Sequence, residues 1–455
     1  MNRLVRSLLA FGLASAQAVA VASVVSAAPD VKDRIAALPG VRIISEGTSG
    51  TARTFVLGIQ QPADHRKPRG LKFEQRFSLL HKAESKPMVL HTSGYHLPGT
   101  INPSEPARLV DGNQISVEQR FFTPSRPSPT DWDDLNIWQA ANDHHRIVGA
   151  FKKIYGARWL STGASKGGMT SIYHRRFFPR DVDATIAYVA PNDVVNDRDI
   201  YGEFIRNVGN DPTCNRRLEG VQRQLLQHRD AVVQRLEAKG YTYKQFGGAH
   251  RALEVLVLDT PFTFWQYGTQ SQCAIVPGAG ASVDDLWTFI DKTVGWDFYT
   301  DAGVAPYETY YYQAGTQLGW PEADESAVRD LLRYPGVSVP RTMVPDSIKF
   351  PRFDRHAMKD VDRWVRYQGS RLLFVNGQND PWSAEPFRLG PGTRDSLSFS
   401  VPGGNHGANI ARLPEQERAA ATAAVLRWAG VSGAVGALAV DEGPDSLDAL
   451  RARRG

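Results

Sequence analysis

The feature that most restricts the fold of this chain is the pentapeptide Gly163-Ala-Ser165-Lys-Gly167. Residues 159–162 before it have the composition of a buried strand, and the residues after it, as far as Phe177, are typical of a helix. A serine in a sharp turn between a strand and a helix needs small neighbours, because the two elements pack closely there. The turn lifts the serine hydroxyl off the sheet, so we predict that Ser165 is a nucleophile. The alternative is a glycine-rich helix start in which Ser165 is an ordinary N-cap.

Strand-like and helix-like segments alternate on both sides of this turn. Strands are expected at residues 54–59, 71–77, 88–91, 115–122, 159–162, 184–190, 371–376 and 397–401, and helices at 133–155, 163–177, 214–239 and 414–428. The order strand, helix, strand, helix, strand around the nucleophile turn is the pattern of a mostly parallel sheet with helices on its faces. We therefore predict an α/β fold.

Residues 193–351 interrupt this pattern. Sheet-like alternation is absent from them, and helical residues are followed by a stretch rich in aromatic side chains. We predict that this mostly helical insertion divides a sheet domain made of residues 29–192 and 352–440. Within the aromatic stretch, Phe262-Thr-Phe-Trp-Gln-Tyr is expected to pack inside the insertion, with a role as a substrate wall as the alternative.

The two ends of the chain are expected to lie outside the folded protein. Two arginines precede an apolar segment, residues 8–25, and small residues follow it. This is the pattern of a secretory signal peptide, residues 1–28, cut near Ala27 or Ala28; the alternative is an uncleaved anchor helix. Because no other apolar run of about 18 residues occurs, we expect a secreted protein without a membrane segment. Residues 441–455 are polar and are expected to form a loose tail.

Composition excludes several other classes of protein. The formal net charge is only +5 and no run of five basic residues occurs, so nucleic acid is not an expected partner. Cys214 and Cys273 are too few for a structural zinc site, and no metal-binding motif accompanies His144 and His145, so no metal or other cofactor is expected. In an exported protein the two cysteines are expected to form a disulfide, with two buried thiols as the alternative.

A serine nucleophile needs a general base, and the base needs an acid that orients it. Asp380 follows a predicted buried strand after a glycine-containing turn, and His406 follows the last predicted strand. With Ser165 they occur in the chain order serine, acid, histidine that accompanies a nucleophile in a strand–helix turn. We therefore predict the triad Ser165, Asp380 and His406. Asp193, which follows the strand after the nucleophile turn, is the rival acid.

Backbone N–H groups beside the nucleophile are expected to stabilise an oxyanion. The first is the N–H of Lys166 at the helix start. The second candidate is the N–H of Tyr95, because Gly94 lets the chain come close after an earlier strand; the alternative is a simple strand-end turn. Glu118 ends another strand, where ligands bind in open α/β sheets, so its carboxylate could hold a substrate ammonium. The alternative for Glu118 is a structural ion pair with Arg120 or another arginine.

The chain resembles the secreted tripeptidyl aminopeptidase family of serine peptidases over nearly the whole mature sequence. The motifs that carry this resemblance are Gly163-Ala-Ser-Lys-Gly-Gly-Met-Thr, Arg176-Phe-Phe-Pro-Arg-Asp-Val-Asp, Tyr188-Val-Ala-Pro-Asn-Asp, Glu118-Gln-Arg-Phe-Phe, Phe264-Trp-Gln-Tyr, Asn379-Asp-Pro-Trp and Gly404-Asn-His-Gly. The sequence Ser-Lys-Gly-Gly in the first motif is far more specific than a serine flanked by two glycines.

The resemblance implies an α/β-hydrolase core with a helical lid. It also implies cleavage of short peptides, tripeptides above all, from free N-termini, with Ser165, Asp380 and His406 as the triad. Under this interpretation Glu118 becomes a stronger candidate for binding the substrate's amino terminus, and Cys214 and Cys273 become a link inside the lid. Two other classes stay open: a secreted esterase or lipase with the same triad, and a catalytically inactive protein that has kept the fold.

Overall fold

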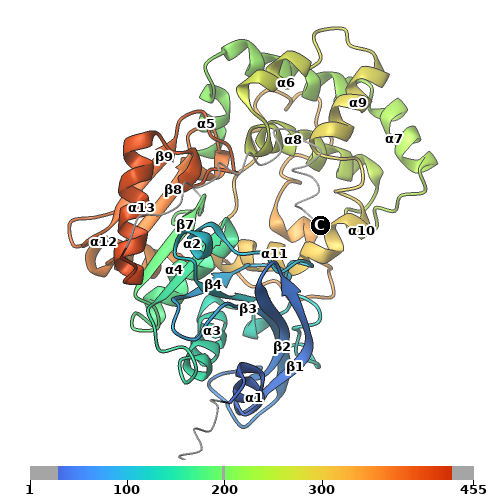
Figure 1. The fold of residues 1–455 in the computed structure, drawn as a ribbon. Helices are drawn as coiled ribbons and strands as arrows, with labels where there is room; N and C mark the ends of the chain where they lie inside the picture. The colour runs from blue at the N-terminus through green and yellow to red at the C-terminus, as the bar shows by residue number, and fades with distance from the viewer. Residues whose placement is uncertain (1–28, 197–199, 433–455) are drawn as a thin grey trace, which may run out of the picture.

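This computed structural model describes residues 29–196 and 200–432, and in them nine strands form one sheet (Figure 1). The strands are β1 (Val41–Ser49), β2 (Ala52–Pro62), β3 (Lys72–His81), β4 (Met88–Thr92), β5 (Asn113–Val117), β6 (Trp159–Ala164), β7 (Ala184–Tyr188), β8 (Leu372–Gly377) and β9 (Leu397–Val401). Their order is β1-β2-β3-β5-β4-β6-β7-β8-β9. The pairings from β1 to β5 are antiparallel, and those from β5 onward are parallel. The predicted mostly parallel sheet is confirmed.

Helices cover both faces of this sheet. On one face, α2 (Glu105–Leu109) and α13 (Glu415–Ala429) share an apolar cluster with Leu373 and Val375 of β8. On the other, α4 (Lys166–Phe177) and α12 (Ala357–Gln368) pack with Leu372 and Phe374 of the same strand. Successive side chains of a strand point to opposite faces, so one buried strand contributes to both clusters. Two further helices, α1 (Val31–Ala36) and α3 (Ile137–Phe151), pack against the antiparallel strands.

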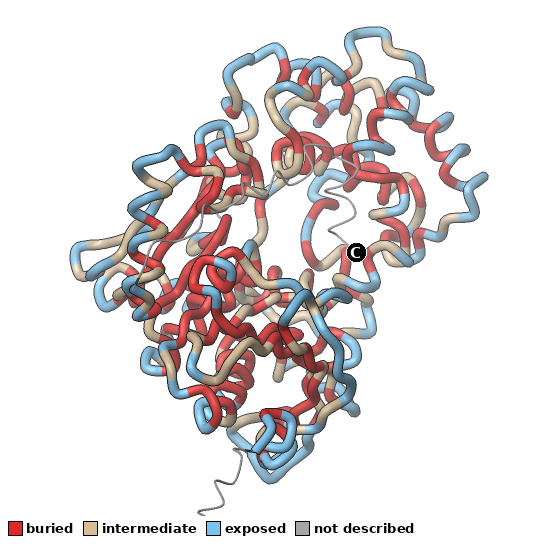
Figure 2. The backbone as a smooth tube through the Cα atoms, viewed as in Figure 1, coloured by how far each residue is buried: buried red, intermediate tan, exposed pale blue. Residues whose placement is uncertain are grey.

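Between β7 and β8 the chain forms a helical segment, residues 201–343, which lies within the predicted insertion and which we call the insertion from here on. Its main helices are α5 (Tyr201–Asn207), α6 (Pro212–Gln227), α7 (Arg229–Ala238), α8 (Ala249–Tyr267), α9 (Val283–Thr293), α10 (Asp301–Val304) and α11 (Glu308–Gln313). Figure 1 shows these helices gathered at one end of the sheet, and Figure 2 shows buried residues along their inner sides. The insertion has its own apolar cluster, which also includes Phe121 and Leu135 from the sheet side of the chain.

Three predicted elements differ clearly from the structure. The helix expected at 133–155 is shorter: it is α3 (Ile137–Phe151), with a short 3₁₀ helix (Trp132–Asp134) before it. The helix expected at 214–239 is two helices, because His228 at their junction has φ −95° and ψ 17°. This break brings Arg229 against the buried Glu254 of α8, with 2.5 Å between Nη2 and Oε1. The strand expected at 115–122 ends at Val117, and the chain that follows leaves the sheet.

The predicted disulfide between Cys214 and Cys273 is present. It joins the first turn of α6 to the short 3₁₀ helix η2 (Gln270–Ile275) that follows α8, and both cysteines belong to the apolar cluster of the insertion. The disulfide therefore fixes the end of α8, which forms one wall of the cavity described below.

Among residues 29–196 and 200–432, no helix is long and apolar enough to cross a membrane. The predicted signal peptide, residues 1–28, and the predicted tail, residues 441–455, lie outside the described residues.

Candidate active site

Ser165 lies in a strained turn between β6 and α4. Its backbone has φ 55° and ψ −130°, which a residue with a side chain rarely adopts. The turn is held by hydrogen bonds from the Ser165 N–H to the Tyr188 carbonyl, 2.9 Å, and from the Met169 N–H to the Ser165 carbonyl, 3.0 Å. Any Cβ on Gly163 would overlap the Gly167 carbonyl. The glycines are thus required by close packing, as the sequence pattern predicts.

Asp380 and His406 meet at the carboxyl ends of β8 and β9. Asp380 is fully buried, and its Oδ2 lies 2.9 Å from Nδ1 of His406. The same carboxylate accepts from the hydroxyl of Ser383 at 2.9 Å and from the N–H of Trp382 at 3.2 Å. Because a carboxylate only accepts hydrogen bonds, Nδ1 of His406 carries the proton and Nε2 is left as an acceptor. Nε2 is buried and has no hydrogen-bond partner among the described residues.

The loop that carries His406 is attached to the insertion. The His406 N–H donates to the Gln266 carbonyl at 2.9 Å. The side-chain amide of Asn405 donates to the carbonyls of Tyr267 and Gly268, at 2.9 and 3.0 Å. The end of α8 therefore positions the histidine as directly as the sheet does.

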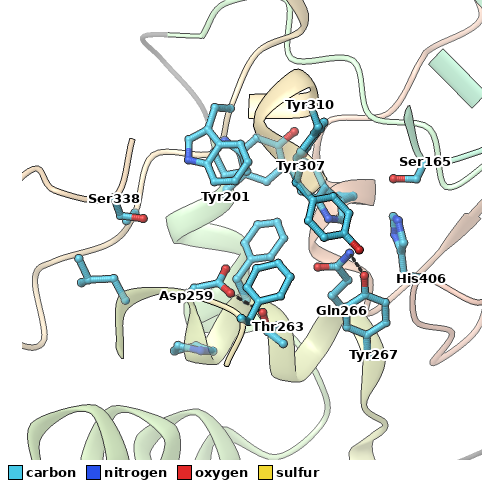
Figure 3. Close-up of a pocket in the computed structure, with 18 of the residues that line it drawn as sticks. Ser165, Tyr201, Asp259, Thr263, Gln266, Tyr267, Tyr307, Tyr310, Ser338 and His406 are labelled. Atoms are coloured by element: carbon cyan, nitrogen blue, oxygen red, sulfur yellow. Dashed lines mark hydrogen bonds between the residues drawn. The ribbon is translucent and has the colours of Figure 1, made fainter. Parts of the chain in front are cut away.

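Ser165 and His406 open into a cavity of about 800 Å³ between the sheet and the insertion. Figure 3 shows these two side chains at one end of the cavity and Asp259 and Ser338 at the other. The lining includes the aromatic side chains Tyr95, Tyr201, Phe262, Tyr267, Phe298, Tyr299, Tyr307, Tyr310, Tyr311, Trp320 and Trp382, and the carboxylates Glu219, Asp259, Glu322 and Asp324. The site is thus a cavity rich in aromatic side chains, with acidic groups in its wall.

The aromatic hexapeptide of α8 serves both purposes considered from the sequence. Phe262, Gln266 and Tyr267 line the cavity. Phe264 and Trp265 are fully buried in the core of the insertion. Because a helix turns 100° per residue, one short run of aromatic residues supplies both the cavity wall and the packing behind it.

The structure partly changes the prediction for oxyanion stabilisation. The N–H of Lys166 begins α4 and has no hydrogen-bond acceptor among the described residues, so it is available beside Ser165. The N–H of Tyr95, in contrast, donates to the hydroxyl of Ser93 at 3.2 Å. The side chain of Tyr95 reaches the nucleophile instead: burial raises the pKa of its hydroxyl, while a hydrogen bond with Ser165 acts in the opposite direction. The hydroxyl thus stays protonated and can donate.

Glu118 does not line the cavity, so the prediction that it binds a substrate ammonium is corrected. Its carboxylate is fully buried and accepts from Nη2 of Arg76 at 2.6 Å, from the N–H of Leu97 at 2.9 Å and from the hydroxyl of Ser125 at 2.7 Å. Arg120 pairs with Asp143 instead, with 2.7 Å between Nε and Oδ2. Glu118 therefore fits the alternative stated above, a structural ion pair, and its partner is Arg76 and not Arg120.

A sheet of this topology, with a serine in a strained strand–helix turn and a buried Asp–His pair beyond later strands, defines an α/β-hydrolase. Comparison with known proteins makes the class more specific. The chain belongs to the PS-10 peptidase S37 family, whose model matches residues 24–452. The resemblance to a family of serine peptidases is thereby confirmed.

A relative that matches over nearly its whole length agrees with this assignment. The chain is 51% identical over 446 residues to the prolyl tri/tetrapeptidyl aminopeptidase of Streptomyces mobaraensis, covering 95% of this chain and 93% of the relative. Among solved structures, a proline iminopeptidase from Mycobacterium smegmatis matches 82% of this chain and 98% of its own, at 14% identity and a TM-score of 0.36. An alpha/beta fold family hydrolase from Bacillus anthracis matches 82% and 98% at 12% identity and a TM-score of 0.33.

Proposed function

We propose that the protein is a secreted serine exopeptidase that releases short peptides, tripeptides above all, from the free N-termini of peptide substrates. The observation that carries the proposal is the position of Ser165 and His406 at one end of a cavity of about 800 Å³. A cavity of this size matches a short peptide and not a folded protein. The 51% identical relative named as a tri/tetrapeptidyl aminopeptidase supports the same activity. The disulfide and the N-terminal sequence pattern support secretion.

In the mechanism we propose, Ser165 attacks the scissile carbonyl while Nε2 of His406 takes the hydroxyl proton. Asp380 keeps the proton on Nδ1 and stabilises the imidazolium that forms. His406 then gives its proton to the leaving amine, and water hydrolyses the acyl-enzyme by the same steps. The N–H of Lys166 and the hydroxyl of Tyr95 stabilise the oxyanion.

An exopeptidase of this kind must recognise the ammonium group of its substrate, and we assign this role to Asp259. Asp259 lines the cavity on α8, and its Oδ2 accepts from the hydroxyl of Thr263 at 2.6 Å. Gln266, whose carbonyl accepts from the His406 N–H, lies seven residues further along the same helix. Seven residues of helix span about 10 Å, and three extended residues of a peptide also span about 10 Å. The spacing along α8 between Asp259 and the residue that anchors the His406 loop is therefore comparable to the length of a tripeptide.

The function is tested with chromogenic substrates of two, three and four residues, each with a free and a blocked N-terminus, beside a short-chain ester. We expect the free tripeptide to have the highest kcat/KM, and blocking its N-terminus to lower this value strongly. Activity on blocked peptides or esters alone would contradict the proposal and favour the runner-up, a secreted esterase or lipase with the same triad.

Replacing Asp259 by asparagine tests the ammonium site. We expect KM for the free tripeptide to rise ~10- to 100-fold, because a hydrogen bond between two charged groups is lost, while ester hydrolysis stays close to that of the wild type. Glu219→Gln, which neutralises another carboxylate of the same cavity wall, is the matched control and should change KM much less. If Glu219→Gln has the larger effect, or neither variant alters KM for the peptide, Asp259 does not bind the ammonium.

A further inference from the structure

Lys166, the residue directly after the nucleophile, is only 1% exposed. Lysine is rarely buried to this extent unless an acidic group pairs with it. Among the described residues no carboxylate forms an ion pair with Lys166, and burial lowers the pKa of its side chain to about 7. A buried ammonium without a salt bridge is unfavourable to folding, so its presence beside the nucleophile calls for an explanation in terms of function.

The ammonium group of Lys166 contacts the loop after β4. Its Nζ donates to the carbonyl of Gly94 at 2.5 Å. It also lies over the rings of Tyr95 and Phe122, 5.4 and 5.3 Å from their centroids. A carbonyl oxygen and two ring faces are all partners that favour a cation. The side chain thus joins the nucleophile turn to the segment that carries Tyr95.

This loop rests directly on the first turn of α4. Gly94 has φ 75°, and a Cβ at this position would overlap the backbone nitrogen of Gly167. The hydroxyl of Thr92 donates to the Gly167 carbonyl at 2.7 Å. Tyr95, the residue after the Gly94 carbonyl, reaches Ser165 with its side chain. Any displacement of the Gly94–Tyr95 peptide would therefore move the Tyr95 hydroxyl away from the nucleophile.

We propose that Lys166 is a positioning residue whose ammonium group holds the Gly94 carbonyl, and with it Tyr95, where the Tyr95 hydroxyl and the Lys166 N–H stabilise the oxyanion. This inference rests on acyl transfer at Ser165, as proposed above. It assigns the side chain of Lys166 a role that the motif alone does not reveal, since only its backbone N–H belongs to the expected oxyanion site.

The charge of Lys166 makes this contact dependent on pH. The titratable groups around it are Tyr95 of the loop, Tyr201 of α5, Tyr310 of α11 and Asp193 after β7. Burial raises the pKa of Tyr95 and of Tyr310, so both stay neutral near pH 7. Because the lowered pKa of Lys166 is about 7, the ammonium is present below this pH and is lost above it. The contact with the Gly94 carbonyl therefore weakens as pH rises through neutrality.

The test compares Lys166→Met with the wild-type enzyme on a free tripeptide substrate between about pH 5 and 9. We expect kcat of the variant to fall ~10- to 100-fold, as for the loss of an oxyanion donor, with little change in KM. The wild type should lose activity on the alkaline side with a midpoint near pH 7, and the variant should lack this decline. Thr92→Val is the matched control, because it removes an uncharged contact between the end of β4, directly before this loop, and α4. It should lower kcat and keep the alkaline decline.

Labelling of Ser165 by a fluorophosphonate separates this proposal from the proposed function. If wild-type Ser165 is not labelled, acyl transfer at Ser165 is excluded. If wild type and Lys166→Met are labelled at equal rates with the same pH dependence, only the positioning role is overturned. If Lys166 has only a structural role, folded Lys166→Met should have a lower Tm and the same kcat and pH profile as the wild type. If Lys166→Met fails to fold, the proposal is tested by the pH dependence of Ser165 labelling in the wild type alone. A labelling rate that does not decline on the alkaline side would then refute the proposal.

Discussion

Replacing Ser165 by alanine is expected to lower kcat by ~10⁶-fold, the largest effect of any single substitution in this chain. Alanine removes only the hydroxyl group whose oxygen attacks the substrate in the proposed mechanism. It has the same Cβ as serine, so the strained backbone at φ 55° is no less favourable for it, and the fold and KM should change little. Steady-state kinetics on a free tripeptide substrate, with the Tm of each variant, measure both.

Ser171→Ala is the matched control for this prediction. Ser171 lies on α4, the helix that begins directly after Ser165. It is fully buried, and its hydroxyl donates to the Gly168 carbonyl at 2.8 Å. Its loss should affect Tm and leave kcat near the wild-type value. Retention of more than about 1% of kcat by Ser165→Ala, far above the residual rate that a site keeps without its nucleophile, would show that the nucleophile is another residue.

Replacing Asp380 by asparagine is expected to lower kcat by ~10⁴-fold. The carboxylate accepts a hydrogen bond from Nδ1 of His406 at 2.9 Å and so leaves Nε2 free to act as the base in the proposed mechanism. An asparagine amide can donate to Nδ1 instead, which moves the imidazole proton to Nε2. In that tautomer His406 has no lone pair directed toward Ser165, even where the geometry of the site is preserved.

Asp181→Asn controls for the general cost of disturbing an aspartate–histidine contact. Asp181, which follows α4, accepts from Nδ1 of His145 on α3 and from Nε2 of His174 on α4, both at 2.9 Å, and none of these three residues lines the cavity. This variant should lower Tm and keep kcat. Equal losses of kcat in Asp380→Asn and Asp181→Asn, or near-normal kcat in Asp380→Asn, would contradict the assignment of Asp380 as the orienting acid.

The parts of the candidate site that can be predicted from the sequence are those marked by short sequence patterns around the residue itself. Ser165, Asp380 and His406 each follow an apolar strand, and parallel strands that end at one edge of a sheet bring such residues together. The glycines beside Ser165 are required by contacts between neighbouring elements. These features depend on short segments whose patterns are visible without the rest of the fold.

The remaining site residues depend on contacts between distant segments. Asp259 lies in an apolar and aromatic helix, where nothing local shows that its carboxylate faces a cavity. The N–H of Tyr95 donates to the Ser93 hydroxyl. We therefore assign oxyanion stabilisation to the side-chain hydroxyl of Tyr95 and not to its backbone N–H. Glu118 meets Arg76 from a neighbouring strand, and the buried ammonium group of Lys166 donates to the Gly94 carbonyl in the loop after β4.

The attachment of the histidine loop to α8 has a consequence for protein engineering. The His406 N–H and the Asn405 amide find their acceptors at the end of α8, in Gln266, Tyr267 and Gly268. A truncated version made of the sheet and its covering helices would leave these donors without acceptors, and His406, the proposed base, would lose one of its supports. The insertion is therefore not a detachable module, and transplanting it between hydrolases would require the matching histidine loop to be carried with it.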